Sequence, residues 1–239
     1  MGRTEREIAE VLALRAKRAR DHVDRLVAKG SVRSCPICHY HGPFSPVRHK
    51  PAIWCPSCDS RPRHRLLKLW LEREAEIPQT ARVLHFAAEP WVREALDVAE
   101  YRTADLNDKF EWQLDITAMD LPDARFDVII ANHVLEHVDD HAALVEIRRV
   151  LSPGGCAILS VPLVAGWETT FDDPTITTAE ERRFHYTDPT HLRFYGQDFG
   201  DRIAAAGLDP SRFTIVGREV QDFALHRGEA IWLGRKPES

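Results

Sequence analysis

The sequence predicts an α/β fold, a doubly wound and mostly parallel sheet with an antiparallel edge strand, preceded by a small N-terminal helix and a four-cysteine zinc ribbon. Three observations support this prediction. Two Cys-Pro-x-Cys segments stand at residues 35–38 and 55–58, apolar strands alternate with helical stretches from residue 82 onward, and the last two strand-like runs have no helix between them. Alternation of strands and helices is typical of a parallel sheet covered by helices on both faces.

The composition is that of an ordinary globular protein, with 239 residues, 44% apolar and 29% charged. This length favours one full-sized α/β domain and a small accessory unit. No apolar run reaches the roughly 18 residues that a membrane-spanning helix needs, and residues 1–20 are charged throughout, unlike a secretory signal. We therefore expect a cytoplasmic protein with no membrane partner.

The N-terminal part is predicted to begin with a helix. Apolar residues recur at near-helical spacing over residues 4–29, and Gly30 follows as a stop. Its wide apolar face predicts packing on the ribbon or on a second subunit, which would make a homodimer. A second helical stretch covers residues 63–71, and Pro78 would end it. We place the domain boundary there, giving domains 1–78 and 79–239.

The four cysteines of the two Cys-Pro-x-Cys segments have the spacing of a zinc ribbon. Cys35 and Cys38 form one i, i+3 pair, Cys55 and Cys58 form the other, and sixteen residues separate them. Two such pairs can present four thiolates to one tetrahedral Zn²⁺, which leaves no position for water. The sequence therefore predicts a closed, structural zinc site. The fifth cysteine, Cys156, lies in an apolar run and is predicted to be a buried thiol.

Charge is distributed unevenly along the chain. Residues 1–68 hold fifteen Lys and Arg against six Asp and Glu, a balance of +9, whereas the remainder carries −14. A basic block of this kind is suited to bind RNA phosphates, here through residues 48–68, or to dock on the acidic half of the same molecule. The sequence leaves both interpretations open.

The second domain is predicted from its alternating elements. After residue 82 the chain is expected to form, in order, strand 82–86, helix 90–99, strand 101–106, strand 126–130, helix 141–150, strand 156–161, and an antiparallel pair at 213–216 and 230–233.

Residues 121–162 contain an ordered set of motifs. Leu-Pro-Asp at 121–123 precedes the strand 126–130, His-Val-Leu-Glu-His-Val follows at 133–138, and Arg-Val-Leu-Ser-Pro-Gly-Gly closes the set at 149–155. In this order and spacing they resemble the class I S-adenosylmethionine-dependent methyltransferases, a family with a Rossmann-like sheet. The resemblance covers roughly residues 80–236 and leaves the ribbon outside it.

The resemblance implies that S-adenosylmethionine binds at the carboxyl ends of the parallel strands. Asp105 would accept hydrogen bonds from the ribose hydroxyls, and Asp115 from the adenine amino group, although a loop aspartate and a helix cap are the respective alternatives. Asn132 would border both the methionine moiety and the acceptor. The cofactor-binding candidates are His85, Phe86, Ala87, Glu89, Asp105, Leu106, Asp115, Ile116, Asn132 and His133.

One turn departs from the family pattern. After the first strand the family has an acidic residue and a glycine-rich turn, whereas residues 85–90 contain no glycine. Ala87 and Ala88 must tolerate close approach of the cofactor or narrow its pocket. Glu89 either replaces the missing acid and pairs with the ammonium group of the cofactor, or stabilises the start of the following helix.

Residues 167–195 are rich in aromatic and titratable side chains. In this fold such an insertion covers the acceptor pocket, and His-Leu-Arg-Phe-Tyr at 191–195 is similar to a sequence of small-molecule members of the family. Imidazoles deprotonate or orient nucleophiles near neutral pH, although each is equally well explained as a structural histidine. The candidate catalytic residues are His133, His137, His185 and His191.

Three functions follow from these observations. The chain is expected to be a methyltransferase acting on a polar small molecule, a sugar or a natural-product acceptor. The alternatives are an RNA methyltransferase whose basic ribbon binds phosphates, and a non-catalytic cofactor-binding or scaffold protein.

Overall fold

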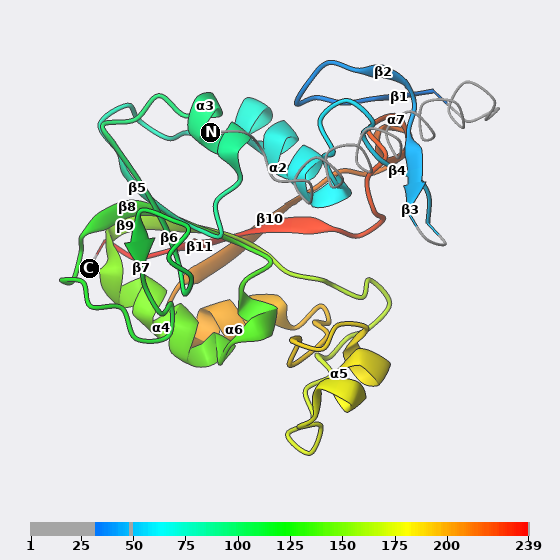
Figure 1. The fold of residues 1–239 in the computed structure, drawn as a ribbon. Coiled ribbons are helices and arrows are strands. Elements are labelled where there is room, and N and C mark those ends of the chain that lie inside the picture. Colours follow the sequence, from blue (N-terminus) through cyan, green and yellow to red (C-terminus); the bar gives the residue numbers. More distant parts are fainter. Residues whose placement is uncertain (1–31, 48–49, 239) are drawn as a thin grey trace, which may run out of the picture. The chain divides into compact units, whose positions relative to one another are not determined.

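The computed structural model describes residues 32–47 and 50–238, which divide into two compact units (Figure 1). The first contains the described residues up to Leu69 together with Val216–His226, and the second contains Trp70–Ile215 with residues 227–238. The helix expected over residues 4–29, and the homodimer inferred from it, lie outside the described residues. The domain boundary after residue 78 stays a prediction.

The first unit consists of two short hairpins, the start of one helix and a returning segment. Strand β1 (Val32–Ser34) pairs antiparallel with β2 (His41–Pro43), and β3 (Ser45–Val47) pairs antiparallel with β4 (Lys50–Trp54). Helix α2 (Pro62–Arg73) begins in this unit, and the short helix α7 (Glu219–Asp222) lies in the segment that returns to it. Cys35, Phe44, Cys55 and Ala224 form its small core.

The second unit is built on a seven-stranded sheet with the order β10-β11-β9-β8-β5-β6-β7. Strands β5 (Arg82–Phe86), β6 (Glu100–Asp105), β7 (Trp112–Gln113), β8 (Phe126–Asn132) and β9 (Leu151–Ser160) are parallel to one another. Strand β11 (Ala230–Arg235) runs antiparallel to both β9 and β10 (Asp209–Thr214). The predicted mostly parallel sheet with an antiparallel strand toward one edge is confirmed.

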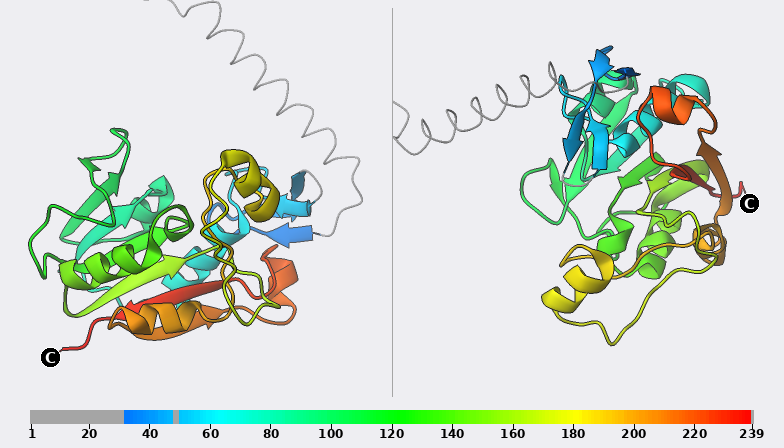
Figure 2. Two further views of the ribbon diagram at one scale, coloured as in Figure 1. Left: turned by 90° about the horizontal axis from the view of Figure 1, so that it is seen from below. Right: turned by 90° about the vertical axis from the view of Figure 1, so that its right-hand side faces the viewer.

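Helices cover this sheet. Figures 1 and 2 show α4 (Asp140–Val150) and α6 (Phe199–Ala205) on one face, and Figure 1 shows α3 (Pro90–Ala95) on the other. Helix α4 starts where the Asp139 side chain accepts a hydrogen bond from Ala142 N at 3.0 Å, as an N-cap aspartate does. Its Leu144 and Ile147 enter the main core together with alternate residues of the strands, such as Leu84 and Ile129.

The Pro-Gly-Gly segment at residues 153–155 forms an irregularity inside β9. The β8–β9 register passes from Phe126↔Leu151 to Val128↔Cys156, so the β9 side contains extra residues. Gly154 has φ +73°, and a Cβ atom on Gly155 would lie 2.9 Å from the Asp127 carbonyl oxygen. Glycine is needed here for backbone geometry.

Helix α5 (Ala179–Tyr186) lies within the long connection between β9 and α6. A capping box starts it, since Thr178 Oγ1 accepts from Glu181 N and the Glu181 carboxylate accepts from Thr178 N. Among the described residues, no helix combines the length and the apolar character needed to cross a membrane.

Candidate functional site

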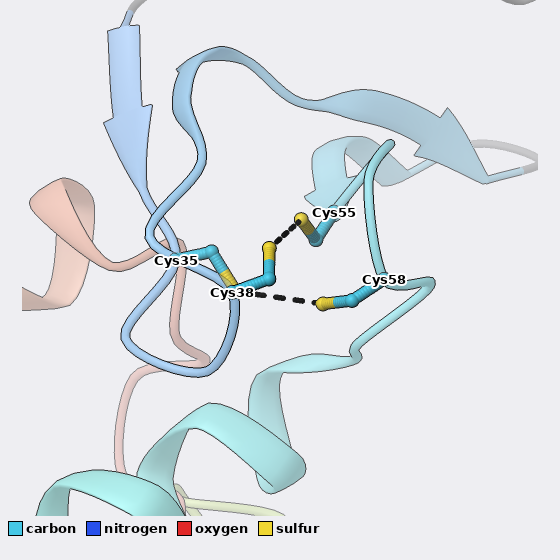
Figure 3. Close-up of side chains that lie close together, drawn as sticks. All are labelled: Cys35, Cys38, Cys55 and Cys58. Carbon is cyan, nitrogen blue, oxygen red and sulfur yellow. Dashed lines mark hydrogen bonds between the residues drawn. The ribbon is translucent and has the colours of Figure 1, made fainter. Parts of the chain in front are cut away.

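The four cysteines predicted to bind metal come together in the first unit (Figure 3). The Sγ atoms of Cys35 and Cys58 lie 3.6 Å apart, as do those of Cys38 and Cys55, and all four lie within 4.8 Å of one another. Four sulfurs bound tetrahedrally to zinc at about 2.3 Å would be separated by about 3.8 Å. The cluster therefore has nearly the dimensions of a zinc–thiolate site.

Two turns of the same geometry present these sulfurs. The amide of His39 donates to the carbonyl of Cys35 at 2.9 Å, and the amide of Asp59 donates to the carbonyl of Cys55 at 3.0 Å. His39 and Asp59 have φ values of +57° and +58°. The second turn therefore repeats the first, as expected for two Cys-Pro-x-Cys knuckles.

The thiols perturb one another. Hydrogen bonds from the neighbouring thiols of Cys55 and Cys58 hold the pKa of Cys35 well below its usual value. The interaction with Cys35 raises the pKa of Cys55 in turn. Four thiolates at this spacing require a cation, because like charges in a partly buried cluster repel strongly.

Arg65 ties the returning segment to the cysteine turns. Its side chain is fully buried, and the guanidinium donates to the carbonyl oxygens of Ser60, Ile53, Phe223 and Ala224 at 2.5–2.8 Å. Sequence reasoning missed this contact, because residues 223 and 224 lie far along the chain and carry no motif. It also counts Arg65 among the phosphate-binding residues, a role that its burial does not support.

In the second unit, the cofactor candidates lie at the carboxyl ends of β5, β6 and β8. His85, near the end of β5, is fully buried. Its Nδ1 lies 2.6 Å from the Tyr101 hydroxyl and its Nε2 lies 3.0 Å from Glu89 Oε2. Burial, reinforced by the charge of Glu89, raises the pKa of Tyr101, so this phenol stays protonated and donates to Nδ1. Nε2 then carries the ring proton and lies in ionic contact with the Glu89 carboxylate, without a hydrogen bond of good geometry between them.

Asn132 extends this network across the sheet. Its Nδ2 lies 3.5 Å from Glu89 Oε2, and its Oδ1 accepts from Ser160 Oγ at 3.1 Å. Hydrogen bonds and the His85–Glu89 ionic contact thus link side chains from β6, β5, β8 and β9. Glu89 ends this network at the start of α3 without making a side-chain cap there, which favours an interaction with another group over the alternative of capping the helix.

The glycine-free turn adopts a conformation that glycine would favour. Ala87 has φ +49°, and its amide donates to the Ala104 carbonyl at 2.9 Å. Alanine adopts this left-handed region at a cost of about 1 kcal/mol or more. The chain therefore retains a sharp turn between β5 and α3 without glycine. Phe86, just before the turn, is buried in the apolar core.

Asp105 and Asp115 lie on adjacent loops. Asp105 ends β6, and its Oδ1 accepts from the amide of Asn107 at 3.0 Å and from Asn107 Nδ2 at 2.6 Å. Leu106 is 57% exposed, which is unusual for a large apolar side chain. Oδ1 of Asp115 accepts from the amide and hydroxyl of Thr117, and Ile116 is buried. No helix starts at Asp115 among the described residues, so the helix cap considered for it does not form; its Oδ1 instead caps a turn.

Three of the four candidate histidines gather after β8. His133 has φ +54°, and its Nδ1 lies 3.0 Å from Oε1 of Glu136, which is fully buried. The rings of His137 and His191 lie 4.8 Å apart, edge to face. Burial lowers the pKa of His191, which keeps that imidazole neutral. Glu136 was not foreseen, because a glutamate beside two histidines in sequence gives no sign of being buried.

His185 lies elsewhere. It is exposed on α5, where its ring contacts the rings of Phe184 and Phe171. Phe184 is 82% exposed. This histidine belongs to an aromatic surface of the 167–195 segment and not to the histidine group after β8.

A buried arginine positions the 191–195 segment against the turn after β8. Arg193 Nη1 donates to the carbonyl oxygens of Leu135 and Val138 at 3.0 and 2.6 Å, and its Nε donates to Asp172 at 2.9 Å. The amide of Leu192 donates to the Glu136 carbonyl at 2.8 Å. These bonds bring His191 to His137 although the two lie far apart in the sequence.

One family model matches part of the chain. Residues 83–159 match a family described as "Methyltransferase domain". An uncharacterized 37.1 kDa protein in transposon Tn4556 of Streptomyces fradiae is 36% identical over 141 residues, which cover 58% of this chain. The match spans only about a third (34%) of that relative's length.

Solved structures share the fold of the chain. The YcgJ protein from Bacillus subtilis has a TM-score of 0.54 and 18% identity, covering 74% of this chain and 100% of that one. The [4+2]-cyclase SpnF has a TM-score of 0.52 and 20% identity, covering 85% and 89%. Haemonchus contortus phosphoethanolamine N-methyltransferase 2, in complex with phosphomonomethylethanolamine and S-adenosylhomocysteine, has a TM-score of 0.51 and 12% identity, covering 73% and 52%. At such identities the likeness shows the fold alone.

Proposed function

We propose that this chain carries a class I S-adenosylmethionine-dependent methyltransferase domain, which contains the family match at residues 83–159. Its acceptor would be a polar small molecule such as a sugar or natural product. One observation carries the proposal. The carboxyl ends of β5, β6 and β8 bring Glu89, Asp105 and Asn132 to one edge of a parallel sheet, directly beside a histidine with a buried carboxylate partner. Ligands of open α/β sheets bind at this edge.

The residues present fit S-adenosylmethionine. When bound, this cofactor supplies a methyl group on a positively charged sulfur. Asp105 would hold the ribose hydroxyls, and the exposed side chain of Leu106 would contact the adenine ring together with Ile116. The left-handed conformation of Ala87 keeps the turn after β5 sharp, so the loss of glycine does not by itself close the site.

Glu89 would take the place of the acid that this turn lacks. The residue at the usual acid position is His85, which is buried and whose Nε2 lies 3.0 Å from Glu89 Oε2. The Glu89 side chain is 14% exposed, so it can reach a ligand while His85 and Asn132 fix its direction. A carboxylate held in this way would pair with the ammonium group of the cofactor.

His133 is the best placed general base among the candidates. Its Nδ1 contacts the buried Glu136 carboxylate, which orients the ring and stabilises the imidazolium. Nε2 would take the proton from an acceptor hydroxyl or amine as that oxygen or nitrogen forms its new bond to carbon and the carbon–sulfur bond breaks. Aligning the acceptor and excluding water would provide most of the remaining acceleration.

The four-cysteine cluster would hold a structural Zn²⁺. Its four thiolate donors fill a tetrahedral shell, and their spacing already approaches that of a bound site. We assign it no step in methyl transfer.

A small-molecule acceptor is favoured over RNA. The RNA hypothesis depends on basic residues between 48 and 68, and Arg65 among them is fully buried against backbone carbonyls. Arg61 stacks over the Trp54 ring, with its guanidinium 5.5 Å from the centroid. The exposed aromatic side chains Trp167 and Phe184 lie in the segment expected to cover the acceptor.

The test is methylation of a fractionated cell extract. The purified chain is incubated with methyl-labelled S-adenosylmethionine and either the small-molecule or the RNA fraction. We expect label in small molecules, and a rate about 100-fold lower for His133→Ala. The exposed His141→Ala is the matched control and should behave as the wild type. Label entering RNA, in a manner weakened by salt, would support the alternative acceptor.

A further inference from the structure

Glu136, His137 and His191 form a second group of metal-binding side chains, separate from the cysteines. Each offers one ligand atom, and the three atoms lie within 4.8 Å of one another. Two imidazoles and one carboxylate are a donor set that proteins use for divalent ions of the first transition row. The group comes from two segments, the turn after β8 and the 191–195 segment, which the Arg193 hydrogen bonds hold together.

Glu136 is buried in a way that calls for a cation. The residue is 0% exposed, and neither carboxylate oxygen has a hydrogen-bond donor among the described residues. Within that same part of the chain, its one ionic contact is His133 Nδ1, 3.0 Å from Oε1. A buried carboxylate without donors is strongly disfavoured unless a positive charge compensates it. Nδ1 of His191 is also buried without a hydrogen-bond partner in residues 32–47 and 50–238.

His137 is held in the tautomer that a metal ligand needs. The Thr190 hydroxyl donates its one proton to Asp188 Oδ1 at 2.6 Å, and it lies 3.0 Å from His137 Nδ1. The hydroxyl must therefore accept from Nδ1–H, which leaves the lone pair on Nε2. A ligating histidine usually donates its other ring nitrogen to a neighbour in this way.

We propose that Glu136, His137 and His191 bind one divalent transition-metal ion. Three protein ligands leave positions open, for water or for an oxygen of a bound molecule. Imidazole donors favour Fe²⁺, Co²⁺ or Zn²⁺ over Mg²⁺, which prefers oxygen ligands. Binding of the ion rests on these side chains alone. The role that we give it, holding an oxygen of the acceptor beside His133, rests on the proposed function and implies an acceptor with a metal-binding oxygen.

The test uses Co²⁺ as the probe on the full-length chain. Co²⁺ is added to purified protein in equilibrium dialysis, and bound cobalt and zinc are both measured. Cobalt at the cysteines gives thiolate-to-metal charge-transfer absorption, whereas cobalt bound by nitrogen and oxygen does not, so the two sites are counted separately. We expect about one Co²⁺ per chain without the thiolate absorption.

Variants locate that cobalt. His191→Ala and Glu136→Gln should each weaken the non-thiolate Co²⁺ site about tenfold or more, while the exposed His141→Ala should leave it unchanged. His137→Ala provides an independent variant if Glu136→Gln fails to fold, as judged by thermal unfolding. Absence of non-thiolate cobalt in the wild type, or equal binding by a folded His191→Ala, would overturn the metal site.

Cofactor binding is measured by calorimetry on the same samples. Cobalt binding without binding of S-adenosylmethionine would contradict the proposed function and leave the metal site standing. Cofactor binding and methyl transfer without non-thiolate cobalt would contradict the metal site and leave the proposed function standing.

Discussion

The cysteine cluster and the histidine–glutamate group of this protein both gather metal-binding side chains, yet they are assembled differently. The four cysteines come from two short turns of repeated geometry, each of which presents two sulfurs. Glu136 and His137 come from the turn after β8, whereas His191 arrives from a loop far along the sequence. The first site is local in sequence and uniform in chemistry. The second depends on the tertiary fold and on a buried arginine, Arg193.

This difference indicates which of the two groups could take part in catalysis. A closed shell of four thiolates leaves no coordination position for a substrate, so it stabilises structure. A group of two imidazoles and one carboxylate, on loops at the carboxyl ends of parallel strands, would leave coordination positions open beside a candidate base.

The largest effect should follow from breaking the local site. Cys35→Ser should abolish stoichiometric zinc binding, which in isolated zinc modules contributes on the order of 10 kcal/mol of apparent binding free energy. We expect zinc content and the thermal unfolding temperature to fall together. Cys156→Ser is the matched control, because this thiol lies outside the cluster and burial raises its pKa. Full zinc content in Cys35→Ser would show that the ligands are assigned wrongly.

Removal of Arg65 should have the next largest effect. Arg65→Ala leaves the carbonyl oxygens of Phe223 and Ala224 without their donor and should lower the free energy of unfolding by about 3 kcal/mol. Arg61→Ala, which loses only an exposed stacking contact with Trp54, should lower it by less than about 1 kcal/mol. Denaturant unfolding monitored by fluorescence measures both. Equal losses would mean that the returning segment does not stabilise the cysteine unit.

Sequence reasoning reached the gathering of the four cysteines and the mostly parallel sheet with an antiparallel edge strand, because both follow from local patterns. It placed strand 82–86 at its observed position and expected the four cysteines to come together, as they do. It did not foresee that Val216–His226 joins the first unit or that Glu136 is buried. Those features depend on contacts between distant segments, which a single sequence does not display. Sequence reasoning gave His137, His185 and His191 the same expected role as catalytic candidates. The fold places His185 apart from the other two.

A smaller effect, on cobalt affinity, should show whether Glu136, His137 and His191 form a metal site or only lie close together by chance. Thr190→Val removes the hydroxyl that orients His137 and should weaken non-thiolate Co²⁺ binding by about tenfold. Thr175→Val is a matched control, since Thr175 makes the same turn with Asp173 on a different loop. Equilibrium dialysis of both variants measures the affinity. If both lose affinity equally, His137 is not held by Thr190 for metal binding.

The smallest effect concerns Asp127, whose carboxylate has hydrogen-bond donors among the described residues, in contrast to that of Glu136. The side chains of Arg82 and Ser152 donate hydrogen bonds to the Asp127 carboxylate, and those from Arg82 lower the pKa of Asp127 to about 2. Because the folded pKa lies below the unfolded value of about 3.9, the stabilisation is present above about pH 4 and is lost as the pH falls toward about 2. Both side chains are partly exposed, so we expect only about 1 kcal/mol.

Denaturant unfolding of the wild type and Asp127→Asn across this pH range tests that expectation. The difference in unfolding free energy should be constant near neutral pH and should shrink below about pH 4. A difference that grows as the pH falls would mean that Asp127 is not ionised and paired in the folded state.

Calorimetric titration of the folded chain with S-adenosylmethionine tests the central claim most directly. We expect one binding site per chain, weakened about tenfold or more in Asp105→Ala through loss of charge-assisted hydrogen bonds, and unchanged in the nearby exposed Asp108→Ala. No detectable binding by the folded wild type, or equal affinity in the two variants, would contradict the placement of the cofactor at the carboxyl ends of β5, β6 and β8.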